Sequence, residues 1–297
     1  MQRRLLLTGA RGFVGRQARP HLEGSFELHC TSTERIAETS GTWHQVDLRD
    51  PAACVELVER VRPDILVHTA WNTRHGEFWE AEDNADWLEA GRALFTAFAD
   101  AGGQRIVACG SCAEYPGAAG QPRREDEAID PSDVATRYGR AKLALLEHLR
   151  GLPVQFAWAR IFFAYGLYED ARRLVPSVVR AVLRGEPARA SSGRQMRDFI
   201  DIRDLGRALA QLAGAPLNGV INLGHGTSVT IGTLVSTIGE LAGRPDLIRL
   251  GALPDRPGEA PVLVPDLSRQ TRELGFLPAI GLREGLGDAL AFWAGHE

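Results

Sequence analysis

The chain has 297 residues, of which 44% are hydrophobic and 24% are charged, and its formal net charge is −4 at pH 7. This composition is typical of a globular protein, and the length allows about two domains of roughly 150 residues each. A chain so close to neutral is not typical of a protein that binds duplex nucleic acid, because such binding depends on clustered Lys and Arg side chains on the phosphates.

The four cysteines, Cys30, Cys54, Cys109 and Cys112, do not follow the spacing of a metal site or of a disulfide framework. Cys109 and Cys112 form a single CxxC, which leaves a redox or zinc role open, but the spacing favours buried thiols. Few cysteines suit a reducing compartment. We find no signal-peptide pattern and no apolar run of about 18 residues that could span a membrane. We therefore expect a soluble, cytoplasmic protein without a metal.

Short apolar runs alternate with helical patterns in the first half of the chain. The runs that predict strands are Arg4–Thr8, Phe26–Thr31, Trp43–Asp47, Ile65–Thr69, Arg105–Gly110 and Val154–Ile161. The stretches that predict helices are Val14–Leu22, Pro51–Arg60, Trp79–Ala101 and Asp133–Arg150. This alternation predicts βαβ units, and the continuous apolar strands indicate a parallel sheet that is buried on both faces.

The pattern changes after about Gly166, where Pro and Gly become frequent and the elements become short. Asp201–Ala213 predicts a further helix, and Val220–Leu223 predicts a strand that rejoins the sheet. Two more helical patterns follow, at Ile231–Ala242 and Leu282–Trp293. We therefore predict an α/β fold with a doubly wound parallel sheet in one domain and a smaller, mixed α/β second domain. Their residue ranges are 1–165 with 199–224 for the first, and 166–198 with 225–297 for the second.

A glycine-rich segment, Thr8–Gly15, joins the first strand to the first helix with the spacing G-x-x-G-x-x-G. Glycine permits the tight turn, the close approach of backbone to a pyrophosphate, and the packing of helix on strand. The helix N-terminus favours an anion. At the first strand–helix junction, these features predict a Rossmann-type, dinucleotide-binding domain. We expect the dinucleotide to contact Gly9, Arg11, Gly12, Phe13, Val14 and Gly15.

The end of the second strand bears on the choice between NAD and NADPH. Proteins that prefer NAD usually place an acidic residue there to bind the ribose hydroxyls, whereas this chain has hydroxyls and then Glu34 and Arg35. Ser32 and Arg35, together with Arg11 in the glycine turn, predict a site for the 2′-phosphate of NADPH. The alternative is that Glu34 turns inward and the arginines are solvated.

The end of the third strand offers candidate contacts to the adenine, Asp47 and Leu48. Asp47 is alternatively the N-cap of the helix that begins near Pro51.

Tyr138 and Lys142 are four residues apart on a predicted helix, which places them on one face of it. An unperturbed phenol has a pKa of about 10, so we expect the nearby ammonium to lower the pKa of Tyr138 toward neutrality. Ser111 follows the strand Arg105–Gly110, at the carboxyl edge where open α/β sheets bind their ligands. Its hydroxyl can bond a substrate carbonyl or alcohol.

Taken together, these features resemble the extended short-chain dehydrogenase/reductases, a group of nucleotide-sugar epimerases, dehydratases and reductases. The resemblance covers nearly the whole chain. It rests on Thr8–Gly15, His68–Ala70, Gly110–Tyr115, Tyr138–Lys142 and Arg197–Asp204. It implies that Tyr138 is the general acid/base, that Lys142 holds the nicotinamide ribose and that Ser111 orients the reacting oxygen. It also implies that Thr69 and Ala70 line the cofactor and that Asn84 matches an asparagine of the family.

Three departures narrow the choice within the family. The sugar dehydratases carry Asp-Glu directly after the Ser/Thr, where this chain has Cys112 and Ala113, so we exclude a 4,6-dehydratase. Glu114 comes one place later, and in a strand-like segment it would point to the other face. The missing acid after the second strand argues against a tightly held NAD and hence against an epimerase. Phe163 stands where the family often has Asn, which implies a more apolar pocket, suited to a deoxysugar.

Basic and aromatic residues mark the substrate end of the predicted site. Arg197 and Arg256 resemble the family's diphosphate clamps, since a guanidinium pairs bidentately with phosphate oxygens. Arg172 and Arg173 are further candidates or surface ion pairs, and His75 is either a base or a loop residue without a role. The predicted substrate contacts are Trp71, Ser111, Cys112, Phe163, Arg197 and Arg256.

The sequence thus predicts an enzyme that uses NADPH to reduce the C4 keto group of a nucleotide-linked 4-keto-6-deoxyhexose. The alternatives are an epimerase with tightly bound NAD, a non-catalytic NADP-binding sensor on the same fold, and a reductase of a non-sugar carbonyl. The family often dimerises through two helices of each subunit, which here are Trp79–Ala101 and Asp133–Arg150, so we expect a homodimer.

Overall fold

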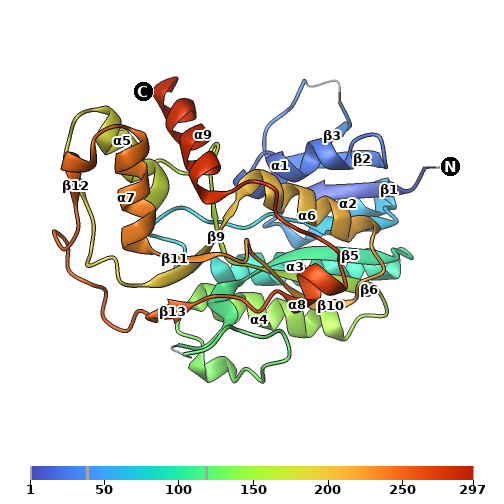
Figure 1. The fold of residues 1–297 in the computed structure, drawn as a ribbon. Helices are drawn as coiled ribbons and strands as arrows, with labels where there is room; N and C mark the ends of the chain where they lie inside the picture. The colour runs from blue at the N-terminus through green and yellow to red at the C-terminus, as the bar shows by residue number, and fades with distance from the viewer. Residues whose placement is uncertain (1, 38–39, 118–119, 297) are drawn as a thin grey trace.

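A computed structural model describes residues 2–37, 40–117 and 120–296. Seven parallel strands form its central sheet, in the order β10-β6-β5-β4-β1-β2-β3 (Figure 1). The strands are β1 (Arg4–Thr8), β2 (Glu27–Ser32), β3 (Thr42–Gln45), β4 (Ile65–His68), β5 (Arg105–Ser111), β6 (Gln155–Ile161) and β10 (Gly219–Leu223). The strand order reverses between β1 and β4, and ligands of open α/β sheets bind at such a point.

Helices cover both faces of this sheet. Helices α1 (Phe13–Leu22) and α6 (Ile202–Gly214) pack on one face, and α2 (Pro51–Val61), α3 (Asn84–Asp100) and α4 (Arg137–Arg150) pack on the other. Successive strand residues alternate between the two apolar cores, since Leu5 and Leu7 face the first and Leu6 faces the second. The predicted Rossmann-type, doubly wound parallel sheet is confirmed.

Later parts of the chain form a second, smaller body with its own apolar core. Its helices are α5 (Leu174–Leu183), α7 (Ile231–Leu241) and α9 (Leu282–Ala294), drawn on the left and at the top of Figure 1. Its strands are β7 (Phe163–Tyr165), β8 (Ala188–Arg189), β9 (Met196–Asp201), β11 (Ser228–Thr230), β12 (Ile248–Arg249) and β13 (Val262–Leu263). The pairing around β9 is mixed, with β11 antiparallel and β7 and β13 parallel.

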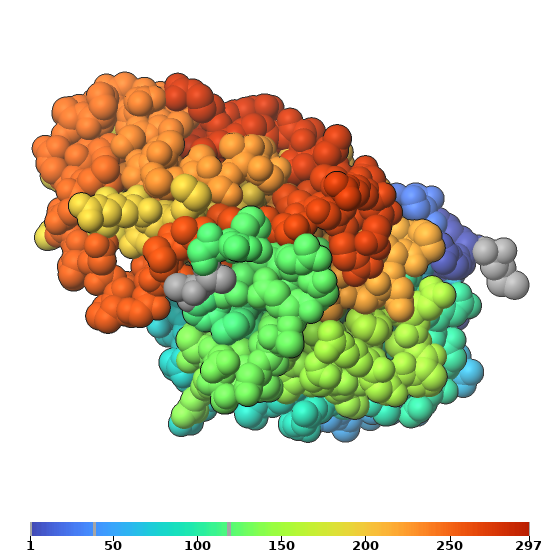
Figure 2. Space-filling view, turned by 60° about the horizontal axis from the view of Figure 1, so that its bottom comes forward, coloured from blue at the N-terminus to red at the C-terminus, as the bar shows by residue number. Residues whose placement is uncertain are grey.

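The late part of the chain packs back on the first body. Figure 2 shows the orange and red residues lying along the green middle segment. Backbone hydrogen bonds explain this contact: the N–H of Arg123 donates to the carbonyl of Val264 at 2.8 Å, and the N–H of Asp266 donates to the carbonyl of Arg123 at 2.7 Å. The short helix α8 (Ser268–Arg272) follows directly.

Several predicted boundaries were wrong by a few residues. The helix expected over Trp79–Ala101 begins only at Asn84, after a series of turns. The helix expected over Asp133–Arg150 begins at Arg137, because Thr136 caps its N-terminus by accepting from the N–H of Gly139 at 3.0 Å. The strand expected over Trp43–Asp47 ends at Gln45. Within the described residues, no helix is both long and apolar enough to cross a membrane.

Candidate active site

The glycine turn between β1 and α1 has the shape of a cradle. Gly9 has a φ of +69°, and a Cβ added there would lie 2.7 Å from the Thr69 hydroxyl oxygen and 2.8 Å from the amide nitrogen of Ala70. A Cβ on Gly15 would collide with the carbonyl oxygen of Gly9. Gly12 is the N-cap of α1 and offers no side chain, which leaves the first amides of the helix for an anion. The turn therefore fits the pyrophosphate of a dinucleotide.

Arg11 extends from this turn toward the end of β2. Its guanidinium pairs with the Glu34 carboxylate at 2.5 Å, and the Glu34 side chain is 72% exposed. Ser32 accepts from the N–H of Glu34 at 3.1 Å. Arg35 is exposed and makes no ion pair with any residue that the structure describes. The structure thus brings Arg11, Ser32 and Glu34 together and leaves Arg35 free beside them.

The two candidates for the adenine lie after β3. Asp47 forms an exposed ion pair with Arg49 at 2.6 Å, while Leu48 is buried. The N-cap of α2 is Asp50, whose carboxylate accepts from the N–H of Ala52 at 2.9 Å. The alternative assignment of Asp47 as that N-cap was therefore wrong.

Thr69 and Ala70 follow β4 and lie directly against the glycine turn. The Thr69 hydroxyl donates to the carbonyl of Thr8 at 2.7 Å, and Ala70 is buried. Behind them, His68 Nδ1 lies 2.9 Å from the Thr8 hydroxyl, and burial lowers the pKa of His68 to about 3. His68 therefore stays neutral, as part of the floor under the turn.

Ser111 and Tyr138 meet because helix α4 approaches the turn after β5 very closely. A Cβ on Gly139, next to Tyr138, would collide with the carbonyl oxygen of Ala113. This contact brings the Tyr138 phenol near the Ser111 hydroxyl, close enough for that hydroxyl to affect the pKa of Tyr138. The Ser111 hydroxyl accepts from the N–H of Ala113 at 3.1 Å, which fixes its position.

The electrostatics of Tyr138 differ from the prediction. Burial raises the pKa of Tyr138, and this effect outweighs the hydrogen bond with Ser111, which lowers it. The expectation that Lys142 lowers this pKa was therefore wrong. Aromatic side chains bury the phenol: the rings of Phe78, Trp79 and Trp71 stand edge-on to Tyr138, with centroids at 5.0, 5.8 and 6.1 Å from that of Tyr138.

Lys142 lies one helical turn after Tyr138 and is only 3% exposed. Its ammonium donates to the carbonyl of Cys109 at 3.0 Å, and burial lowers the pKa of Lys142 to about 8. The sequence itself singles out this position: Lys142 is the only lysine among the 34 lysine and arginine residues of the chain, and the other 33 are arginines. Because the remaining 33 positions are all arginine, the lysine at 142 indicates chemistry that a guanidinium does not provide.

Glu114 was wrongly placed by the prediction of a strand-like segment. Residues Cys112–Glu114 form a 3₁₀ turn, η1, in which Glu114 is fully buried. Its carboxylate pairs with Arg160, 2% exposed, at 2.8 Å, and accepts from the N–H of Ser111 at 2.7 Å and from the Trp158 indole at 3.0 Å. The S-x-x-E spacing of a capping box, Ser111 to Glu114, was the signal that could have revealed this.

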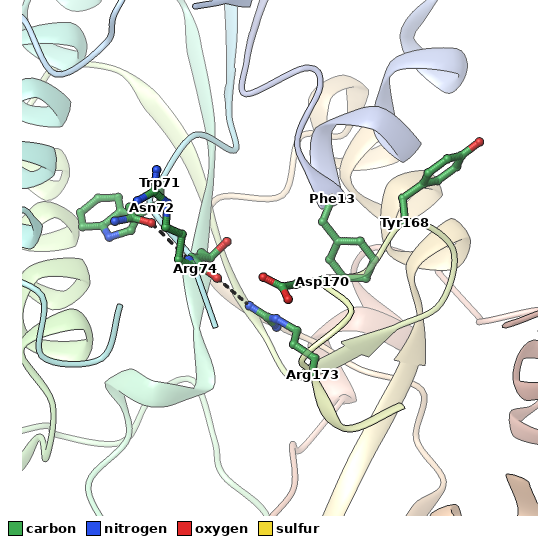
Figure 3. Close-up of a pocket in the computed structure, with 8 residues that line it drawn as sticks. Phe13, Trp71, Asn72, Arg74, Tyr168, Asp170 and Arg173 are labelled. Atoms are coloured by element: carbon green, nitrogen blue, oxygen red, sulfur yellow. Dashed lines mark hydrogen bonds between the residues drawn. The ribbon is translucent and has the colours of Figure 1, made fainter. Parts of the chain in front are cut away.

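A pocket of about 330 Å³ opens between the segment after β4 and the segment after β7 (Figure 3). Arg173, on the second segment, donates to the carbonyl of Thr73 on the first at 3.4 Å. The prediction included Phe13, Trp71 and Arg173 but missed the other lining residues, because loop residues without a motif carry no pattern. Its full lining is Phe13, Trp71, Asn72, Thr73, Arg74, Tyr168, Asp170 and Arg173.

Two of the loop candidates, Arg172 and His75, interact with residues that line this pocket. Arg172 pairs with Asp170 at 2.9 Å on the surface, which is the arrangement of the surface ion pair that we left open. Burial lowers the pKa of His75, and the nearby Arg173 adds to that effect.

The remaining substrate candidates surround β7 and β9. Arg197 is 3% exposed and pairs with Glu259 at 2.8 Å, and its guanidinium lies 5.3 Å from the Phe163 ring centroid. Arg256 is exposed and makes no ion pair with a described residue. Cys112 packs with apolar neighbours, and burial raises its pKa to about 12, so the thiol stays protonated. All four cysteines are buried, and each keeps its thiol rather than forming a disulfide.

A dinucleotide cradle at a reversal of strand order, with a hydroxyl, a tyrosine and a lysine beside it, defines the short-chain dehydrogenase/reductase class. The chain belongs to the NAD dependent epimerase/dehydratase family, whose model matches residues 5–224.

Three known proteins show how this chain relates to the family. It is 29% identical over 321 aligned positions to dTDP-4-dehydro-6-deoxy-D-allose reductase of Streptomyces bikiniensis, and the match covers 99% of this chain and 97% of the relative. It is 29% identical over 165 residues to UDP-glucuronic acid decarboxylase 6 of Arabidopsis thaliana, but there the chain spans only 48% of the relative's length. A solved structure of MoeE5 in complex with UDP-glucuronic acid and NAD superposes with a TM-score of 0.84, at 27% identity over 99% of this chain and 100% of that one.

Proposed function

We propose that this protein uses NADPH to reduce the C4 keto group of a nucleotide-linked 4-keto-6-deoxyhexose. One observation carries the proposal: Ser111 and Tyr138 form a hydroxyl pair beside Lys142, while the Glu114 carboxylate is held in a buried ion pair. A dehydration needs a further acid and base on the sugar, whereas reduction of a ketone needs one proton donor. The full-length similarity to a 4-keto-6-deoxysugar reductase supports the same conclusion.

The proton chemistry follows from the burial of Tyr138. Because its pKa is raised, Tyr138 is a protonated phenol at neutral pH, which is the state that a reduction requires. NADPH, when bound, supplies the hydride for C4. Tyr138 gives its phenol proton to the oxygen that develops at C4, Ser111 donates a hydrogen bond to the same oxygen, and the Lys142 ammonium stabilises the negative charge.

Further residues have proposed roles in binding. Arg11, Ser32 and Arg35 bind the 2′-phosphate of NADPH, once Arg11 exchanges Glu34 for the phosphate. The remaining cofactor contacts are the glycine turn, Asp47, Leu48, Thr69, Ala70, Tyr138 and Lys142, with Lys142 on the nicotinamide ribose.

The sugar nucleotide has its own proposed site. We assign residues 166–198 and 225–297 as the substrate-binding part of the chain, with Arg197 and Arg256 on the diphosphate. Cys112 and Phe163 form the apolar wall of the sugar pocket. For the quaternary structure we propose a homodimer through α3 and α4, which lie side by side on one face of the sheet. Gel filtration with light scattering tests this homodimer.

The test is to follow the loss of NADPH absorbance with dTDP-linked and UDP-linked 4-keto-6-deoxyhexoses, with NADH as the comparison cofactor. We expect loss with NADPH and little with NADH. Tyr138→Phe is expected to abolish turnover and to leave NADPH binding, measured by fluorescence titration, nearly unchanged. A rearranged sugar without net loss of cofactor would mean an epimerase. NADPH binding without any change in the sugar would overturn the proposed reductase.

A further inference from the structure

The Lys142 ammonium has an unusual environment for a buried charge. It is 3% exposed, it donates one hydrogen bond, to the Cys109 carbonyl, and it forms no ion pair within 4.0 Å in the described part of the chain. A buried ammonium is costly unless its charge is compensated. A single carbonyl leaves much of that charge without a partner, so another group must stabilise it.

Trp71 supplies that group. The ammonium nitrogen of Lys142 lies 3.8 Å from the centroid of the Trp71 ring, which is cation–π geometry with the aromatic side chain that binds cations best. The indole N–H donates to the Asn84 carbonyl oxygen at 2.9 Å, and the ring stacks with Trp87 at 6.0 Å. The indole therefore has a fixed orientation before any ligand enters.

Both ends of the Asn84 side-chain amide are hydrogen-bonded, so Asn84 holds the Trp71 indole rigidly. It is buried at the first residue of α3, and its amide donates to the carbonyls of Phe78 and Ala81 at 2.8 and 2.9 Å. Two contacts within the protein thus connect Asn84 to Lys142: the hydrogen bond from the Trp71 indole to Asn84, and the cation–π contact between Trp71 and Lys142.

We propose that Trp71 is a positioning residue, whose indole face holds the Lys142 ammonium charged and in place beside Tyr138, and that Asn84 fixes the indole. This inference rests on the proposed function, in which Lys142 and Tyr138 act together. Trp71 thereby acts through Lys142, in addition to any contact that it makes with a sugar.

The titration of Lys142 can be observed without interference from its neighbours. The titratable groups that face it are His68 on β4, Cys109 on β5, Glu114 on η1 and Tyr138 on its own helix. Near pH 8, His68 is neutral, and Cys109 and Tyr138 are protonated. The Glu114 carboxylate is paired with Arg160 at 2.8 Å rather than with Lys142. Lys142 is therefore the group in this cluster that changes charge there.

The test uses the single lysine of the chain. Protein grown with lysine labelled with ¹³C at Cε gives one lysine signal, that of Lys142, and its shift against pH gives the titration midpoint. We expect a midpoint near 8 in the unchanged protein. Trp71→Leu is expected to lower it by about 0.5 to 1.5 pH units, because the ammonium loses the aromatic face. Trp71→Phe, which keeps a ring, is expected to lower it less.

Trp79→Leu is the matched control. Trp79 also stands edge-on to Tyr138, at 5.8 Å, but makes no ring contact with Lys142. We expect its removal to leave the Lys142 midpoint unchanged. If Trp71→Leu does not fold, the unchanged protein still decides, because the Cε protons of a lysine held over an indole face resonate far upfield of those of a free lysine.

An ordinary proton shift in the unchanged protein would overturn the inference, as would an unmoved midpoint in Trp71→Leu. The proposed function fails separately. A shifted midpoint in a protein that reduces no keto sugar would leave the positioning role standing and refute the reductase. If the protein reduces the keto sugar but Trp71→Leu leaves the Lys142 midpoint unmoved, the reductase stands and the positioning role is refuted.

Discussion

The buried pair between Glu114 and Arg160 permits a quantitative prediction about stability. The two side chains are 0% and 2% exposed, and they meet at 2.8 Å between Nε and Oε2. Arg160→Met keeps an apolar stem of similar length but leaves the Glu114 carboxylate buried without its counter-charge. Breaking a buried pair in this way costs about 3–5 kcal/mol of unfolding free energy, a large part of the roughly 5–15 kcal/mol that a globular protein has.

The measurement is urea unfolding followed by circular dichroism, with the free energy extrapolated to water. The matched control is Arg244→Met, which removes an arginine from an exposed pair with Asp246 and is expected to leave the free energy of unfolding almost unchanged. The double variant Glu114→Gln with Arg160→Met removes both charges and should recover part of the loss. A single Arg160→Met variant as stable as the Arg244→Met control would refute the reasoning that this pair compensates a buried charge.

Three further predictions concern the glycine turn, the cofactor and pH. Gly15→Ala places a Cβ against the Gly9 carbonyl, so we expect a lower melting temperature and lost NADPH binding in a fluorescence titration; unchanged binding would contradict the cradle. Arg35→Ala is expected to lower kcat/KM for NADPH about tenfold or more and to spare NADH, and an equal loss with both cofactors would remove Arg35 from the phosphate site. Burial raises the pKa of Glu169 from 4.5 to about 8, so its stabilising effect is present below about pH 4.5 and is lost as the pH rises through about 8. Between about pH 5 and about pH 9, the free energy of unfolding measured in urea should fall more for the unchanged protein than for Glu169→Gln. An equal fall in both proteins would contradict the raised pKa of Glu169.

The local features of this protein could be predicted from the sequence because they depend on neighbours in the chain. The spacing of apolar residues predicts the strands and helices of the first body, the three glycines predict the turn, and the i, i+4 spacing places Tyr138 and Lys142 on one helix face. The Ser-x-x-Glu capping box at Ser111 was equally local and could have been recognised.

Burial and partner choice were decided by the tertiary structure. Arg160 meets Glu114 from a strand 46 residues further along the chain, and Trp71 meets Lys142 from a different strand–helix unit. The raised pKa of Tyr138 arises from three aromatic rings that no spacing rule places around it. Periodicity reports which face of an element is apolar, but the energy of a buried charge depends on which atoms surround it. Those atoms come from distant parts of the chain that only the packed fold brings together.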